Sequence, residues 1–155
     1  MNIERIFTIS PAGGPQLAHD QVTVAAGAGI EGDRYFGRRE EPGQNITLVE
    51  AEAIESFLNE FARVHDLSIT KRNLVTRGVR LNELVGREFF VGDVKLRGVE
   101  LCEPCLGLGT ALAAPTLTAA AVVKHFVHRG GLRADVLSSG TITCGAELRS
   151  DASAH

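Results

Sequence analysis

Short apolar runs separated by turn-forming residues dominate the chain and predict a body made mainly of β-strands. Each run has the length of a strand and is bounded by glycine, proline or polar residues. The Gly92-Asp93 pair between two such runs is typical of a tight hairpin turn. We expect strands at 3–9, 21–24, 45–49, 88–91, 94–101, 133–137, 141–144 and 147–149, with a second hairpin joining 133–137 to 141–144.

Two segments change to the spacing of a helix. In residues 50–64, apolar side chains recur three and four positions apart and form one stripe, made by Ile54, Phe57, Leu58 and Phe61. A second helix is expected from Thr116 or Thr118 to His128. A threonine can cap its start, and Arg129-Gly130-Gly131 supplies a cation and a stop signal at its end.

Several short strands with one or two helices predict an α+β fold that is mainly β, built as a closed or nearly closed β-barrel. We expect one domain over residues 1–149, followed by a frayed tail at 150–155, because no linker, repeat or low-complexity segment divides the chain. Residues 35–43 are polar and irregular and predict a mobile surface loop.

Composition and charge exclude several classes of partner. The 155 residues are 44% hydrophobic, which is enough for one core, and the formal net charge is −3. This charge gives no reason to expect nucleic acid or an anionic membrane, so any anion site would be a local cluster of cations. No apolar run approaches the ~20 residues of a membrane span, and the N-terminus lacks the pattern of a signal peptide. We therefore expect a cytoplasmic protein with no nucleic-acid or membrane partner, whose three cysteines are free thiols.

Cys102 and Cys105 lie three positions apart at the end of an expected strand, and Pro104 stiffens the turn between them. A structural zinc site would need a second pair of ligands, and a thioredoxin-like dithiol would open a helix in a βαβ unit. The surrounding sequence gives neither signal. Both stay open as less favoured alternatives, and the third use of such a pair is one functional thiolate with a buried neighbour. Cys105, past the proline, is the better candidate, while Cys102 and Cys144 are expected to be packing residues.

Two cationic segments are candidates for binding an anion. Lys71-Arg72-Asn73 with Arg77 places three cations and an amide within seven residues, and arginine offers phosphate a planar fork of donors. The plainer alternative is a solvated basic turn. In residues 128–133, Arg129 and Arg133 flank two glycines whose backbone N–H groups can form an anion nest, although a helix C-cap explains the same pattern.

Taken together, these segments resemble the MOSC family, named for the C-terminal domain of molybdenum cofactor sulfurase. The resemblance covers nearly the whole chain and rests on the order and spacing of several motifs. These are Gly-Ile-Glu-Gly-Asp-Arg at 29–34, Gln-Asn-Ile-Thr-Leu-Val-Glu at 44–50, Arg-Asn-Leu-Val-Thr-Arg-Gly at 72–78, Leu-Val-Gly at 84–86, the Cys102–Cys105 turn and His-Arg-Gly-Gly-Leu-Arg at 128–133. The resemblance implies a barrel of the MOSC or pyruvate-kinase-barrel type and a small stand-alone bacterial member.

The resemblance also implies the residues of a site. The hallmark cysteine of the family corresponds best to Cys105, which would be both the catalytic thiolate and the ligand of molybdenum in a molybdopterin cofactor. The cofactor-binding residues that it implies are Lys71, Arg72, Asn73, Arg77, Arg129 and Arg133.

Three functions stay open at this point. The first is a molybdenum-dependent oxidoreductase that reduces small N-hydroxylated compounds with electrons from a donor protein. The second is a sulfur carrier, in which a cysteine desulfurase loads a persulfide on Cys105 for cofactor or metal–sulfur cluster assembly. The third is a non-catalytic module that binds a pterin or another phosphate-bearing ligand.

Overall fold

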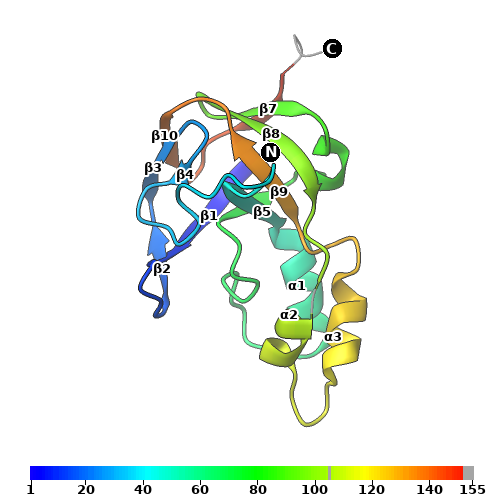
Figure 1. Cartoon of the computed structure of the whole chain (residues 1–155). Helices are drawn as coiled ribbons and strands as arrows, with labels where there is room; N and C mark the ends of the chain where they lie inside the picture. Colours follow the sequence, from blue (N-terminus) through cyan, green and yellow to red (C-terminus); the bar gives the residue numbers. More distant parts are fainter. Residues whose placement is uncertain (105, 152–155) are drawn as a thin grey trace.

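Two sheets and three α-helices form the fold of the computed structural model, which describes residues 1–104 and 106–151 (Figure 1). The strands are β1 (Asn2–Ile9), β2 (Gln16–His19), β3 (Gln21–Ala25), β4 (Gly29–Ile30), β5 (Ile46–Glu50), β6 (Leu74–Arg77), β7 (Glu88–Val91), β8 (Val94–Leu101), β9 (Leu132–Val136), β10 (Gly140–Thr143) and β11 (Leu148–Ser150). The helices are α1 (Ala51–Glu60), α2 (Leu106–Leu112) and α3 (Ala119–Phe126), with a 3-10 turn, η1, at Leu81–Leu84. The protein is therefore mainly β with a few helices, as the sequence predicts.

The larger sheet has eight strands in the order β11-β7-β8-β9-β5-β6-β1-β2, and the smaller sheet has the order β10-β3-β4. Neighbouring strands are antiparallel except β5 and β6, which are parallel. Helix α1 connects these two strands, because parallel neighbours need a crossover. The crossover sets Leu74, at the start of β6, opposite Leu48 in the middle of β5.

The larger sheet curls strongly, so that its strand β1 approaches the segment that leads into β11. The N–H of Ile3 donates to the carbonyl oxygen of Ala146, and the N–H of Leu148 donates to that of Met1, each at 3.0 Å. No continuous ladder joins β1 to β11 in the described part of the chain. The sheet is thus a strongly curled half-barrel, and of the expected closed or nearly closed barrel, full closure is a slight overstatement.

Two apolar clusters hold the layers together. One fills the inside of the curl, where Phe89 is fully buried. The other lies between the sheet and the helices, where the rings of Phe57 and Phe126 have centroids 5.1 Å apart. Strand β5 serves both clusters, because Leu48 belongs to the first and the next residue, Val49, to the second. Figure 1 shows the three helices grouped on one side of the curled sheet.

Local signals in the sequence located several elements correctly. The hairpin joined at Gly92-Asp93 is confirmed, since β7 and β8 pair on either side of it. Thr118 caps α3, because its Oγ1 accepts a hydrogen bond from the N–H of Ala121 at 3.1 Å. Helix α1 ends before its predicted end, since Ala62 has a left-handed φ of 51°.

The hairpin predicted between the last two long strands is wrong. Both strands form, but β9 pairs with β5 and β8 in the larger sheet, whereas β10 pairs with β3 in the smaller sheet. Two serines hold the connection between the sheets. The hydroxyl of Ser138 accepts from the N–H of Lys95 at 2.8 Å, and that of Ser139 accepts from the N–H of Ala26 at 2.9 Å.

Helix α2 has no clear signal in the sequence, because Gly107 and Gly109 both have low helix propensity. The packing of α2 explains one of these glycines. A Cβ at Gly109 would lie 2.6 Å from the carbonyl oxygen of Ala119 and 2.9 Å from Cγ2 of Val123. The missing side chain therefore lets α2 lie directly against α3.

The first residues of the segment expected to be a frayed tail, 150–155, are paired with the sheet. Ser150 pairs with Phe89, and the N–H of Asp151 donates to the carbonyl oxygen of Glu88 at 3.2 Å, so both residues adjoin β7. The rest of the expected tail, 152–155, lies outside the described residues. Each of the described helices is too short or too polar to cross a membrane.

Gly131 precedes β9 with a φ of 109°, and an added Cβ would overlap the carbonyl oxygen of Leu48. We expect Gly131→Ala to lower the free energy of unfolding by about 3 kcal/mol or more, because two backbone segments would have to separate. Chemical denaturation measures this loss. Gly13→Ala is the matched control, because Gly13 also has a positive φ but no atom within 4 Å of the added Cβ. The control should lose about 1–2 kcal/mol, and equal losses in the two variants would contradict the steric explanation.

Candidate functional site

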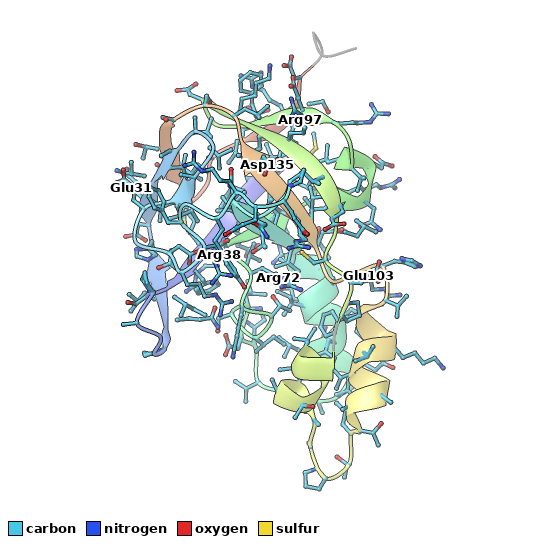
Figure 2. The ribbon with its side chains drawn as sticks, viewed as in Figure 1. Glu31, Arg38, Arg72, Arg97, Glu103 and Asp135 are labelled. Carbon is cyan, nitrogen blue, oxygen red and sulfur yellow. The ribbon has the colours of Figure 1, made fainter. Side chains whose placement is uncertain are left out.

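A cavity of about 250 Å³ lies at the junction of the strands β5, β8 and β9 with the segments around them. Its lining comes from the loop before β5, β5 itself, the residues before β6, the turn after β8, and β9. The lining residues are Tyr35, Arg38, Gly43, Gln44, Thr47, Arg72, Leu101, Cys102, Glu103 and Arg133. Figure 2 labels Arg38, Arg72 and Glu103 across the middle of the molecule. Arg97 lies near the top of the view, at the end of the sheet away from the helices.

Asn73, one of the predicted cofactor-binding residues, is a buried structural amide. Its Oδ1 accepts hydrogen bonds from the N–H and the hydroxyl of Thr47, at 3.1 and 3.2 Å. Its Nδ2 donates to the carbonyl oxygen of Phe7 at 3.1 Å. These bonds tie β5, β1 and the start of β6 together beneath the cavity that Thr47 lines. Both amide atoms of Asn73 therefore already have protein partners, and its role here is to support the floor of the cavity.

Arg72, also predicted to bind the cofactor, lines the cavity directly. The preceding residue, Lys71, has a left-handed φ of 58° and turns the chain just before Arg72. The Nε of Arg72 donates to the carbonyl oxygen of Gly130 at 3.1 Å, which fixes the guanidinium. No carboxylate among residues 1–104 and 106–151 forms an ion pair with it. The guanidinium thus keeps donors that can bind an anion.

The turn that follows β8 is held against the turn between α3 and β9. The N–H of Cys102 donates to the carbonyl oxygen of Gly131 at 2.8 Å. Gly130 lies so close that an added Cβ would overlap the carbonyl oxygen of Cys102. Across the same junction, Nδ1 of His128 lies 3.3 Å from Oε1 of Glu103. The two turns are therefore one rigid unit at the edge of the cavity.

Cys102 is the thiol that the described residues bring to the cavity. Its side chain is buried, and this burial raises the pKa of the Cys102 thiol, against the opposing positive charges of Arg72 and Arg133. A raised pKa keeps the thiol protonated near neutral pH, which suits the packing role predicted for this residue. Cys105 lies outside the described residues, so its predicted role as the functional thiolate stays a prediction.

The lining carries more positive than negative charge. Arg133, another predicted residue, reaches the cavity from β9, and its Nη1 lies 2.7 Å from Oε1 of Glu100. The lining therefore contains three guanidinium groups, those of Arg38, Arg72 and Arg133, and one carboxylate, that of Glu103. The cavity is therefore a local cationic cluster in a protein whose net charge is −3.

The loop of residues 35–44 forms one wall of the cavity, and several hydrogen bonds hold its backbone; the mobility expected of it stays a prediction. Within it, Oε1 of Gln44 accepts hydrogen bonds from two loop N–H groups at 3.0 and 3.3 Å. Nδ2 of Asn45 donates to the carbonyl oxygen of Arg38 at 3.0 Å. From β9, Oδ1 of Asp135 accepts from another loop N–H at 2.8 Å. These bonds hold the backbone of the loop over the cavity.

Sequence reasoning missed the three side chains that this loop contributes, Tyr35, Arg38 and Gln44. A signal was present in the two adjacent amide residues at 44 and 45, because short amide side chains often bind nearby backbone groups and order a turn. The loop is irregular in its secondary structure, and irregularity alone does not indicate motion.

Comparison with known proteins identifies the family of this chain. The sequence profile of the MOSC domain matches residues 33–149. The chain belongs to the MOSC family. The match contains every residue that lines the cavity. A search of curated proteins gives no significant match.

Solved structures share the fold of this MOSC protein at low sequence identity. YuaD from Bacillus subtilis has a TM-score of 0.78 and 21% identity, with 94% of this chain and 92% of that chain covered. YiiM from Escherichia coli has a TM-score of 0.65 and 17% identity, with 96% and 69% covered. YiiM from Geobacillus stearothermophilus has a TM-score of 0.70 and 18% identity, with 96% and 73% covered. At these identities, the likeness shows the fold alone.

The cavity of this MOSC domain does not include all of the predicted cofactor-binding residues. The guanidinium of Arg77 contacts the carboxylates of Glu4 and Glu55, each at 2.5 Å, and these carboxylates raise the pKa of Arg77 above its usual value. Arg129 lines a separate hollow beside α3, and Lys71 is exposed outside the lining. Of the predicted residues, Arg72 and Arg133 are the ones that line the cavity with their side chains.

We expect Asn73→Ala to lower the free energy of unfolding by about 2–4 kcal/mol, because it leaves buried groups of Thr47 and Phe7 without partners. Chemical denaturation checks this. The exposed neighbour provides the control, and Lys71→Ala should change the same free energy by less than about 0.5 kcal/mol. An Asn73→Ala variant as stable as wild type would contradict the structural role of this amide.

We expect Cys102 to react slowly with iodoacetamide near pH 8, since a raised pKa lowers the fraction of thiolate at a given pH. Its alkylation rate should rise as the pH increases beyond 9. Peptide mass spectrometry follows this residue separately from the other thiols, and the urea-unfolded chain gives the reference rate. A folded-state rate at pH 8 equal to the unfolded rate would contradict a buried, protonated thiol.

Proposed function

We propose that this MOSC protein binds a molybdenum–pterin cofactor in the cavity and uses it to reduce small N-hydroxylated compounds. In this proposal, Arg72 and Arg133 hold the phosphate of the pterin, and the thiolate of Cys105 ligates molybdenum. The observation that carries the proposal is that arginine side chains line the same cavity as the turn that leads to Cys105.

The arginines suit a phosphate in both charge and geometry. A guanidinium presents five N–H donors in a fixed fork that matches phosphate oxygens. The bond from Arg72 to Gly130 occupies Nε, so the terminal nitrogens of Arg72 can turn to a ligand. Arg133 shares its charge with Glu100, which makes Arg72 the stronger of the two anchors.

A metal ion in this cavity would have to bring most of its own ligands. No group of three His, Cys, Asp or Glu side chains suited to a metal ion occurs in residues 1–104 and 106–151. The dithiolene of a pterin cofactor supplies two sulfur ligands, so one protein thiolate would add a third. A thiolate is the form that binds a soft metal, and Cys102 is buried with a raised pKa. We assign the ligand role to Cys105 because the hallmark cysteine of the MOSC family corresponds best to it.

When bound, the cofactor would supply the two electrons of the reduction. Conversion of an N–OH group to N–H also consumes two protons and releases water. Glu103 lines the cavity, and its partner His128 has a side chain that is 73% exposed to solvent. This pair is suited to pass protons from solvent to a substrate in the cavity. A separate electron-donor protein would return electrons to the cofactor.

Elemental analysis together with pterin fluorescence tests the proposal on protein from cells supplied with molybdate. We expect stoichiometric molybdenum and pterin in the wild-type chain. Cys105→Ser should lose molybdenum and retain pterin, because its phosphate anchors are intact, whereas Arg72→Ala should lose most of both. Cys144→Ser is the matched control, because this thiol is not part of the cavity lining.

Two results would contradict the proposal: wild-type protein without molybdenum under these conditions, or equal molybdenum in wild type and Cys105→Ser. A mass increase of one sulfur atom on Cys105, absent from Cys105→Ser and without bound molybdenum, would instead support the sulfur carrier loaded by a cysteine desulfurase. If wild type and Cys105→Ser bound the same amount of pterin and neither contained molybdenum, this result would support a non-catalytic binding module.

A further inference from the structure

The wall of the cavity formed by Tyr35 and Arg38 has no part in the function proposed above. We propose that Arg38, positioned by the ring of Tyr35, is a further anion-binding residue that makes the cavity selective for a doubly charged tetrahedral group. The group is either a phosphate monoester on an organic ligand or a free inorganic oxyanion. This inference rests on the proposed anion site at Arg72 and adds the residue that sets its charge preference.

Arg38 is positioned at the cavity by hydrogen bonds of its backbone and by a contact of its side chain. Its N–H donates to the carbonyl oxygen of Tyr35 at 3.0 Å, and its own carbonyl oxygen accepts from Nδ2 of Asn45 at 3.0 Å. Its Cζ lies 5.4 Å from the centroid of the Tyr35 ring, and that of Arg34 lies 4.6 Å from the same centroid. A guanidinium at this distance is attracted by the ring, so Tyr35 restrains the direction of the Arg38 side chain.

Two guanidinium groups of the lining have no carboxylate partner among the described residues, which is the reason to expect a dianion. Arg133, the third arginine of the lining, pairs with Glu100. Neither Arg38 nor Arg72 has a carboxylate partner within residues 1–104 and 106–151. Two guanidinium groups on different sides of one cavity are best neutralised by one ligand with two negative charges.

Tyr35 allows a direct measurement, because it is the only tyrosine of a chain without tryptophan. Its intrinsic fluorescence therefore reports on the wall of the cavity alone. The full chain, prepared from cells that cannot make the pterin, is titrated with sulfate or perchlorate at constant ionic strength. These two anions share a tetrahedral shape and differ in charge. We expect saturable binding of sulfate that is about tenfold or more tighter than that of perchlorate.

Variants then separate the roles of the two residues, with calorimetry as the readout because Tyr35 variants lose the fluorophore. Arg38→Ala should weaken sulfate binding about tenfold, through the loss of a charge-assisted contact. Tyr35→Leu should weaken it about two- to fivefold, and Tyr35→Phe, which keeps the ring, should restore the wild-type affinity. Arg39→Ala is the matched control, because Arg39 belongs to the same loop but not to the lining.

Phenyl phosphate, a phosphate monoester on a ring, distinguishes the two sources of the anion. Tighter binding of phenyl phosphate than of sulfate would support the site and assign it to an organic phosphate, and equal or weaker binding would support it for a free oxyanion. Equal effects of Arg38→Ala and Arg39→Ala would overturn the inference, as would equal affinities for sulfate and perchlorate. If either result occurred and Arg72→Ala still weakened sulfate binding, the inference about Arg38 would fail but the anion site of the proposed function would stand. If Arg72→Ala had no effect either, the inference and the proposed anion site would both fail.

Discussion

The close contact of the Gly130-Gly131 backbone with two other segments constrains everything around the cavity. Gly130 packs on the carbonyl group of Cys102, and Gly131 packs on that of Leu48. Because neither position has room for a side chain, the turn between α3 and β9 rests directly on β5 and on the turn after β8. The same turn offers the carbonyl oxygen that binds Nε of Arg72. Four segments that are distant in the sequence therefore meet at one point, and the cavity opens beside it.

The part of the fold that the sequence predicted is the part whose signals are local. The hairpin at Gly92-Asp93 and the cap at Thr118 act over a few residues, and both form as expected. The partners of β9 and β10 depend instead on β5, β8 and β3, which no short stretch of sequence contains. Helix α2 was missed because two glycines weaken its helical signal, and one of them, Gly109, is required by the packing of α2 on α3.

For the candidate site, the sequence predicted the cationic segment but not which of its side chains face the cavity. The family motifs pointed to Arg72 and to Arg77, yet Arg77 is paired with two carboxylates, and Arg72 is bound only through a backbone carbonyl. The two arginines are close in sequence, and only the fold reveals which one keeps donors for a ligand. For the same reason the sequence could not show that the amide of Asn73 is engaged by β5 and β1. Arg38 lines the cavity because a loop without regular structure is held against β9 and Asn45, which no local sequence signal predicts.

The backbone bonds between β1 and residues 145–148 have a consequence for the kinetics of folding. They join residues that are far apart in the sequence, whereas the hairpin of β7 and β8 pairs neighbouring segments. Contacts of long sequence separation form slowly, because the entropy of closing the intervening loop opposes them. We therefore expect the curl of the larger sheet to close after its local hairpins have formed.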